Sequence, residues 1–433
     1  MAPFILHNSR LIDPLTDYDG PGSIKIADGI IQEVIRSHEH FSTYDGETSI
    51  DCNGYCLAPG IVDMHVFIGE PGARHKESFN SGGHAAAAGG ITTIVTQPDT
   101  LPVIDDPAMV EFIHHRAKEA SPVKVLPTAA MTKGLQGQMM TEYQFLKDSG
   151  AVALSNAYSQ IKNTGIMCKC LEYATSTENL IMYHPHDADL SLNKCATSGV
   201  TATRMGLPSV HVLAEAIALE RDIRLVEISK ARYHADQLSS KKALESICKA
   251  KENNLQITAS ASVMHLFFNE DAILNYKTFS RVTPPLRSEY DRHHVVQAIA
   301  NGIIDVITSA HRPQDEESKR LPYHQAASGA IGLETLLSAS LNLYFNHYVT
   351  LPQLFRCLSL NPSKILKQNT GHISPGSPAD LVLFDINQKW EVKRHDLLSK
   401  SKNSPFHNLT LTGRVLRTFV NGRQVFNSSH STL

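Results

Sequence analysis

Residues 59–97, PGIVDMHVFIGEPGARHKESFNSGGHAAAAGGITTIVTQ, contain two short apolar runs separated by a segment long enough for a loop and a helix. The runs 61–64 and 91–95 are rich in Ile, Val and Thr, residue types that favour strands. Short β-branched runs that alternate with helix-length segments are typical of βα units on a parallel sheet. This stretch therefore predicts a strand, a helix and a second, parallel strand.

The alternation continues to about residue 368 and gives eight runs: 61–64, 91–95, 123–126, 151–154, 180–183, 223–226, 255–258 and 303–307. Eight strands with crossover helices predict an α/β fold, a closed (β/α)8 TIM barrel, over residues 59–368. We expect one helix to begin after Ser209 as its N-cap, because apolar residues follow at helical spacing from Val210. A doubly wound open sheet is the weaker alternative, since no glycine-rich phosphate loop follows the first run.

Both chain ends consist of short extended runs joined by turns. Asp28-Gly29 and Asn421-Gly422 each separate two such runs and predict hairpins. We therefore expect residues 1–58 and 369–433 to form together a small β-sandwich-like domain.

The composition excludes several classes of protein. The chain has 433 residues, 42% of them hydrophobic, and its 40 Lys+Arg against 43 Asp+Glu give a net charge of -3. This balance provides no positive field for nucleic acid or anionic lipid, and no apolar run is long enough to span a bilayer. We expect a cytoplasmic protein that binds neither nucleic acid nor membrane, with its seven cysteines reduced.

Polar residues follow the predicted strands, where the site of a TIM barrel lies. A single histidine at such a position is more often a hydrogen-bonded core residue than a ligand. Several polar residues that converge from different strands make a functional site the better interpretation. These residues are His65, Gln97, Asp99, Asn156, His184, Glu227 and His311.

Several motifs resemble those of dihydroorotase, a cyclic amidohydrolase of the amidohydrolase superfamily. They occur in the same order from about residue 50 onward: PGIVDMH (59–65), EPG (70–72), HKE (75–77), AAAAGGITT (85–93), TPPLRSE (283–289), GLET (332–335), NPSKIL (361–366) and ADLVLF (379–384). The resemblance implies a TIM barrel and a role in pyrimidine biosynthesis. It also implies a metal-dependent site that opens a cyclic amide.

The metal motif of the family changes at several positions. Phe67 replaces the second histidine of the His-x-His motif, Asn156 replaces the bridging acid after strand four, and Ala310 replaces the aspartate that acts as the base. His65 and His184 are retained, and Glu227 matches the strand-six histidine. Because amide hydrolysis in the family needs a metal-activated hydroxide and a base, these changes predict loss of the metal set and of the base.

The positions that hold the substrate in the family also differ. Asp99 replaces an asparagine, and an aspartate there would repel a substrate carboxylate. Thr283 replaces a second asparagine, and Gly69 replaces an arginine. His311 remains, and Arg312 beside it could supply a replacement cation.

Two hypotheses follow. The first is a catalytically silent homologue without a cofactor, which acts as a structural or regulatory partner of aspartate transcarbamoylase. The second is an active, rewired amidohydrolase with one zinc ion held by His65, His184 and Glu227, and with His311 as the candidate base. The resemblance implies a homodimer in either case.

Overall fold

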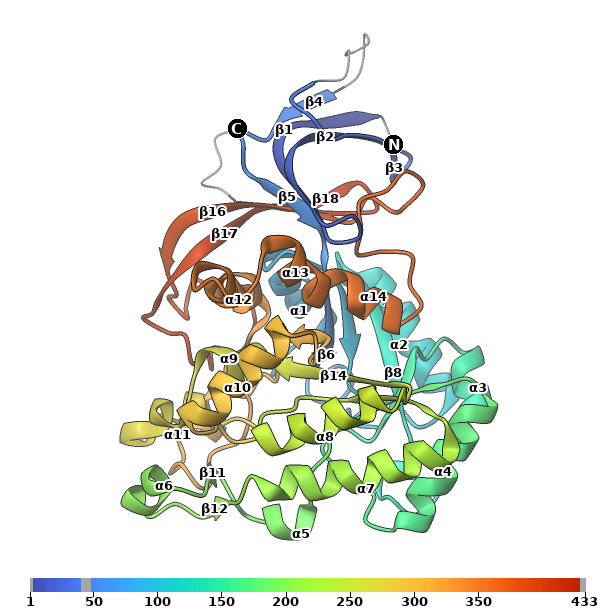
Figure 1. Ribbon diagram of the computed structural model, residues 1–433, viewed down its shortest axis with the longest axis vertical. Coiled ribbons are helices and arrows are strands. Elements are labelled where there is room, and N and C mark those ends of the chain that lie inside the picture. Colours follow the sequence, from blue (N-terminus) through green and yellow to red (C-terminus); the bar gives the residue numbers. More distant parts are fainter. Residues whose placement is uncertain (1–2, 40–47, 429–433) are drawn as a thin grey trace.

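The computed structural model describes residues 3–39 and 48–428 and has two parts, a barrel and a sheet at one end of it (Figure 1). The barrel has eight parallel strands in the order β15-β14-β13-β10-β9-β8-β7-β6. They are β6 (Ile61–Val66), β7 (Ile91–Thr96), β8 (Lys124–Ala130), β9 (Ala153–Ser155), β10 (Leu180–Tyr183), β13 (Arg232–Ala235), β14 (Ile257–Ser262) and β15 (Val306–Thr308). The predicted TIM barrel is confirmed.

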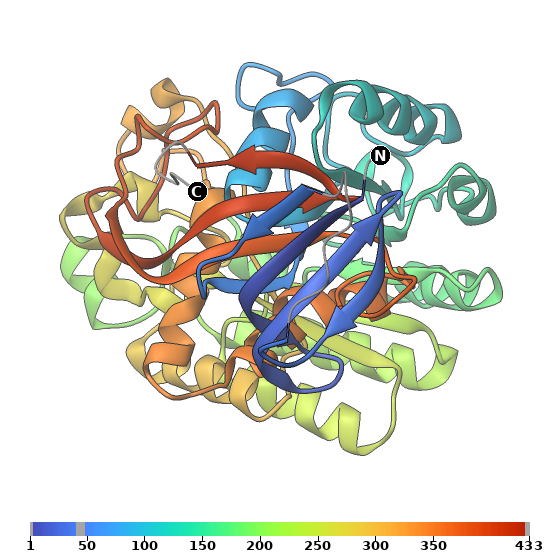
Figure 2. The same ribbon diagram turned by 90° about the horizontal axis from the view of Figure 1, so that it is seen from above.

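Helices surround this barrel (Figure 2). The longer ones are α1 (Phe79–Ala88), α2 (Pro107–Ala120), α3 (Tyr143–Asp148), α4 (Thr164–Ser176), α7 (Leu213–Ser229), α8 (Lys241–Glu252), α10 (Glu289–Ala300) and α12 (Leu336–Phe345). Shorter α-helices are α9 (Val263–Phe267), α11 (Glu316–Arg320), α13 (Leu351–Phe355) and α14 (Asn361–Ile365). In the described residues, no helix is both long and apolar enough to cross a bilayer.

The two chain ends build one eight-stranded sheet, in which β5 pairs with β16. Its strands are β1 (Phe4–Asp13), β2 (Tyr18–Ala27), β3 (Ile30–Ile35), β4 (Thr48–Asp51), β5 (Cys56–Pro59), β16 (Leu381–Glu391), β17 (Thr410–Val420) and β18 (Arg423–Asn427). Both predicted hairpin turns are present, and their tips meet. A Cβ on Gly29, at φ +78°, would lie 2.8 Å from the carbonyl oxygen of Asn421, so glycine is required there.

Residues 185–212, which we call the cap, lie at the end of the barrel away from this sheet (Figure 1). The cap contains α5 (Ala188–Ser191), β11 (Ala196–Thr197), α6 (Val200–Met205) and β12 (Ser209–Val210). Because β6 follows β5 at the sheet end, the carboxyl ends of the strands point toward the cap. The cap therefore covers the face where the site of a TIM barrel lies.

The predicted sixth strand is wrong. Residues 223–226 lie in α7, whose buried positions Ala218, Asp222 and Leu225 follow helical spacing, and the strand forms later as β13. The helix begins at Leu213, and Ser209 lies in β12 instead of capping it. All seven cysteines are free thiols, as expected.

Candidate active site at the barrel mouth

The barrel closes between β6 and β15, where two candidate histidines lie. Val66 and His311 form a parallel bridge, and the backbone N–H of Phe67 donates to the carbonyl oxygen of His311 at 2.8 Å. The side chains of His65 and His311 are almost fully buried. Closure of the barrel thus brings together residues that are far apart in the sequence.

His65 is the centre of a hydrogen-bonded chain. Its Nδ1 lies 2.5 Å from Oδ2 of Asp236, and its Nε2 lies 3.2 Å from the hydroxyl of Tyr158. That hydroxyl donates to Gln237 Oε1 at 3.2 Å. Burial raises the pKa of Asp236, but the charge and hydrogen bond of His65 outweigh it and lower that pKa to about 2. Burial raises the pKa of Tyr158, so its hydroxyl stays protonated. Asp236, His65 and Tyr158 therefore form an acid-base chain at the mouth.

Three of these hydrogen-bonded residues, Asp236, Gln237 and Tyr158, are not among those predicted from the sequence. Asp236 and Gln237 directly follow β13, so the misplaced sixth strand hid them from a search of strand ends. Tyr158 lies three residues beyond β9. The available signal for β13 was the run RYHA (232–235), but this run is short and not apolar.

Glu227 is not part of the site. It lies on the exposed surface of α7, where Arg224 Nη1 contacts its carboxylate at 3.2 Å. The two-histidine, one-carboxylate zinc site predicted from His65, His184 and Glu227 is therefore wrong in its third ligand.

The remaining predicted metal positions do not assemble into a ligand set. Asn156 Oδ1 accepts from Thr132 Oγ1 at 2.9 Å, and its Nδ2 donates to the carbonyl oxygen of Ser159 at 2.9 Å, so its amide is already used. Within residues 3–39 and 48–428, no three His, Cys, Asp or Glu side chains are grouped so that they could hold a metal ion. Both ring nitrogens of His65 are engaged by protein groups. The donor set does not fit the metal pair that the resemblance implies.

His184 lies beside the hydrogen-bonded side chains of Asp236, His65 and Tyr158. Its Nδ1 is 3.1 Å from the carbonyl oxygen of Asp236, and its ring packs edge-on to Tyr158 at 5.0 Å between centroids. Burial lowers the pKa of His184 to about 3. The ring is therefore neutral at pH 7.

Arg312 and Asp99 form an ion pair at 2.5 Å between Nη2 and Oδ2. The guanidinium also lies over the rings of Phe67 and Tyr158, at 4.7 and 4.9 Å from their centroids. Asp99 is thus neutralised by a neighbour within the chain, and the apolar ring of Phe67 contributes to a cation–π stack. Arg312, predicted as a replacement cation for the substrate carboxylate, already has its charge matched by Asp99.

His311 and Thr283, the other two candidates, are engaged by the protein. His311 Nε2 lies 3.5 Å from the buried carboxylate of Glu77, within the range of an ion pair but without a hydrogen bond, and its Nδ1 accepts from the backbone N–H of Gly332 at 3.3 Å. The hydroxyl of Thr283 lies 2.7 Å from that of Ser328. These contacts give His311 a fixed orientation and leave its role as a base a prediction.

Besides His311 with its Nε2, four other polar side chains at the mouth each keep one buried atom without a hydrogen-bond partner in the described part of the chain. They supply two amide donors, one guanidinium donor and one carboxylate acceptor: Gln97 Nε2, Gln237 Nε2, Arg312 Nη1 and Asp99 Oδ1. Buried polar atoms are rarely left unpaired, so such a set points to a binding site.

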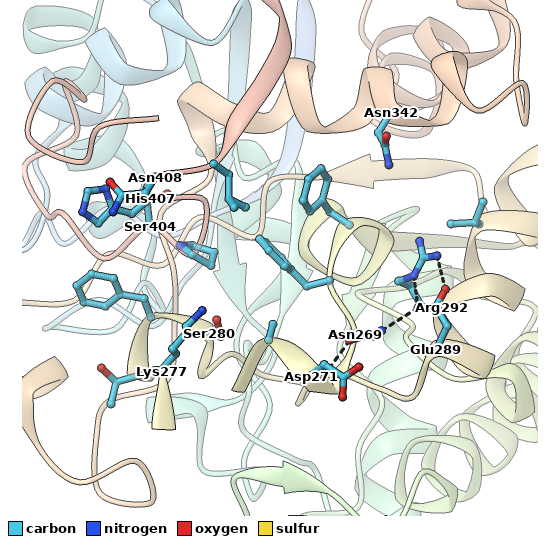
Figure 3. A pocket seen from close by; sticks show the side chains of 18 of the residues that line it. Asn269, Asp271, Lys277, Ser280, Glu289, Arg292, Asn342, Ser404, His407 and Asn408 are labelled. Carbon is cyan, nitrogen blue, oxygen red and sulfur yellow. Dashed lines mark hydrogen bonds and ion pairs between the residues drawn. The ribbon is translucent and has the colours of Figure 1, made fainter. Parts of the chain in front are cut away.

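A larger cavity of about 1110 Å³ lies outside the mouth (Figure 3). Asn269 Nδ2 donates to Glu289 at 3.0 Å there, and Arg292 Nε donates to the same carboxylate at 2.7 Å. None of the predicted site residues lines it. The mouth is therefore the better candidate site.

We expect Arg312→Met to lower the free energy of unfolding by about 1–3 kcal/mol, because it leaves the Asp99 carboxylate largely buried and without its cation. Asp99→Asn should recover part of this loss in the double variant. Urea denaturation of the four proteins of the cycle measures the coupling. Additive losses would contradict the ion pair.

Comparisons with known proteins agree with this architecture. The model of the dihydro-orotase-like family matches residues 54–243. A dihydroorotase from Syntrophus aciditrophicus (strain SB) is 36% identical over 422 residues, 98% of this chain and 99% of that protein. A dihydroorotase from Anaplasma phagocytophilum (strain HZ) is also 36% identical, over 97% of this chain and 94% of that protein.

The fold is shared with solved structures of lower identity. An L-hydantoinase (dihydropyrimidinase) from Arthrobacter aurescens has a TM-score of 0.88 at 22% identity and covers 100% of this chain and 98% of its own. The dihydropyrimidinase of Brevibacillus agri NCHU1002 has a TM-score of 0.83 at 19% identity over 98% of this chain and 95% of its own. With the barrel, its polar mouth and the full-length similarity to dihydroorotases established, the chain belongs to the dihydro-orotase-like family of amidohydrolases.

Proposed function

We propose that this chain serves pyrimidine biosynthesis as a dihydroorotase-type protein that binds a cyclic amide, of the dihydroorotate kind, at the barrel mouth. The observation that carries the proposal is the set of unpaired buried atoms of Gln97, Gln237, Asp99 and Arg312. A ring amide has both N–H donors and carbonyl acceptors, so it can satisfy donors and an acceptor together. The similarity to dihydroorotases over nearly the whole chain supports the same class of ligand.

Two versions of this function differ in whether the bound ring is opened. In the first, the chain binds the ring without hydrolysing it and acts as a partner of aspartate transcarbamoylase. The donor set supports this version, because the nitrogens of His65 are engaged, the amide of Asn156 is engaged and Ala310 has no titratable group.

In the second version, the chain is an active cyclic amidohydrolase. Two observations favour it. The similar proteins are dihydroorotases, and the hydrogen-bonded side chains of Asp236, His65 and Tyr158 can transfer a proton. Tyr158 would exchange that proton with the substrate, His65 would exchange it in turn with the Tyr158 hydroxyl, and Asp236 would stabilise the imidazolium ring by its negative charge.

Calorimetric titration with L-dihydroorotate and N-carbamoyl-L-aspartate, followed by an assay of their interconversion with and without added zinc, tests both versions. The first version predicts that the ligands bind and that their interconversion stays at the uncatalysed rate both with and without zinc. The second predicts turnover that falls by at least about 100-fold in Asp236→Asn, a loss typical for an acid-base group. His115→Gln, on the exposed face of α2, is the control. Absence of binding by both ligands would contradict the proposed function.

A further inference from the structure

A second, smaller cavity lies between the cap and the segment 281–287, next to the barrel mouth. Its volume is about 180 Å³, smaller than the sites of drug-sized ligands. Tyr158 and His184 line it from the barrel, Lys194 lines it from the cap, and Arg281 and Arg287 line it from the segment 281–287. It therefore adjoins the hydrogen-bonded chain of His65 through Tyr158.

The charges around this cavity are unbalanced. Arg287 is paired with Glu215, at 3.3 Å between Nη2 and Oε2. Within the described residues, neither Lys194 nor Arg281 has an ion pair with a carboxylate of the chain. The carboxylate of Glu215 is the only acidic side chain among the described lining residues, so two positive charges remain uncompensated.

The neighbouring titratable groups do not compensate these charges. Burial lowers the pKa of His184 to about 3 and also lowers that of His186, so both rings are neutral at pH 7. Burial likewise raises the pKa of Tyr158, whose hydroxyl remains neutral. Next to Arg281, the buried amine of Lys319 donates to the carbonyl oxygens of Thr278 and Arg281, at 3.0 and 3.3 Å. Burial and the charge of Arg281 lower the pKa of Lys319 to about 7, so this amine is only partly charged at pH 7. This part of the molecule therefore favours an anion.

We propose that this cavity binds the carboxylate of a small acidic amide, between Lys194 and Arg281, with the amide part of the ligand toward Tyr158 and His184. The inference rests on the proposed function and deepens it, because it locates the charged group of the ligand. That group is held by Lys194 and Arg281 and not by Arg312, whose charge is matched by Asp99. Lysine and arginine both donate charge-assisted hydrogen bonds to carboxylates, and the neutral groups beside them supply orientation.

The test is calorimetric titration of the full chain with three probes: N-carbamoyl-L-aspartate, succinate, and dihydrouracil, whose ring carries no carboxylate. Arg281→Gln and Lys194→Gln should each weaken binding of N-carbamoyl-L-aspartate by at least about tenfold and leave dihydrouracil binding unchanged. Arg224→Gln, an exposed arginine of α7 with a surface partner, is the matched control. Thermal unfolding of each variant checks that it is folded.

The outcomes separate this inference from the proposed function. An unchanged Kd for N-carbamoyl-L-aspartate in the Arg281→Gln, Lys194→Gln double variant would overturn the inference. So would a loss of succinate binding in Arg312→Gln alone, because succinate has no amide for Arg312 to bind, and so would the failure of both acidic probes to bind the wild-type chain. In the first two cases dihydrouracil binding would still support a cyclic-amide site. Binding of succinate that depends on Lys194 and Arg281, without binding of the ring, would support the inference and count against the proposed ring ligand.

Discussion

Glu215→Ala is expected to lower the free energy of unfolding by about 3–5 kcal/mol, because it leaves the buried guanidinium of Arg287 without its counter-ion. The side chains of Glu215 and Arg287 are 2% and 4% exposed. The backbone N–H groups of Ser239 and Ser240 donate to Glu215 Oε1 at 3.0 Å each, and both hydroxyls also donate to its carboxylate. One carboxylate thus joins the first turn of α7 to the loop between β13 and α8.

Arg287 extends this network into the cap. Its Nε donates to Ser239 Oγ at 2.9 Å and its Nη1 to Thr197 Oγ1 at 3.2 Å. Loss of Glu215 should therefore destabilise the cap as well as the barrel, and faster amide hydrogen exchange in residues 185–212 would report this directly.

Glu227→Ala is the matched control for this prediction. It removes a glutamate from the same helix, but one that is exposed and paired only with exposed Arg224, so we expect a change within about 0.5 kcal/mol. Urea denaturation monitored by circular dichroism measures both variants. Equal losses in the two would contradict the assignment of Glu215 as a buried structural charge.

Glu215 and Glu227 both lie on α7, the helix that was mistaken in part for the sixth barrel strand, and this error shows which parts of the fold can be predicted from the sequence. The predicted apolar runs overlap seven of the eight barrel strands, because most of these strands are buried on both faces and read as continuous apolar stretches. The sixth could not be found in this way: α7 contains the apolar run 223–226, whereas β13 is short and contains Arg232 and His234. The error moved the expected site residue from Asp236 to Glu227.

The site shows a second limit. Sequence position placed His65, Asp99, His184 and Arg312 near the mouth, because strand ends converge in any TIM barrel. It did not reveal their pairing, since Arg312 reaches Asp99 across 213 residues and His65 reaches Asp236 across 171. The charged run RPQDEESKR (312–320) is typical of an exposed loop, but Lys319 within it is 3% exposed, because its amine donates to backbone carbonyl oxygens of the segment 278–281.

The free energy of unfolding is expected to fall as the pH drops from about 6.5 to 4.5, by about 2 kcal/mol for each of His184 and His265. Burial lowers the pKa of His184 to about 3 and, together with the charge of Arg287, that of His265 to about 4, from 6.5 in the unfolded chain. Between those values the unfolded chain binds more protons than the folded one. The stability that the neutral rings contribute is therefore fully present above about pH 6.5 and is lost as the pH falls.

The contacts of each ring explain why protonation is unfavourable. His265 Nε2 lies 3.1 Å from the carbonyl oxygen of Pro284, whereas its Nδ1 is buried without a partner, so a second proton there would gain no hydrogen bond. His184 packs against the rings of Tyr158 and His186. Urea denaturation between pH 7.5 and 4.5 should give a shallower pH dependence for His184→Gln and for His265→Gln than for the wild type. His115→Gln, whose ring is 81% exposed, should follow the wild-type curve, and parallel curves for all four proteins would show that neither buried ring is linked to folding.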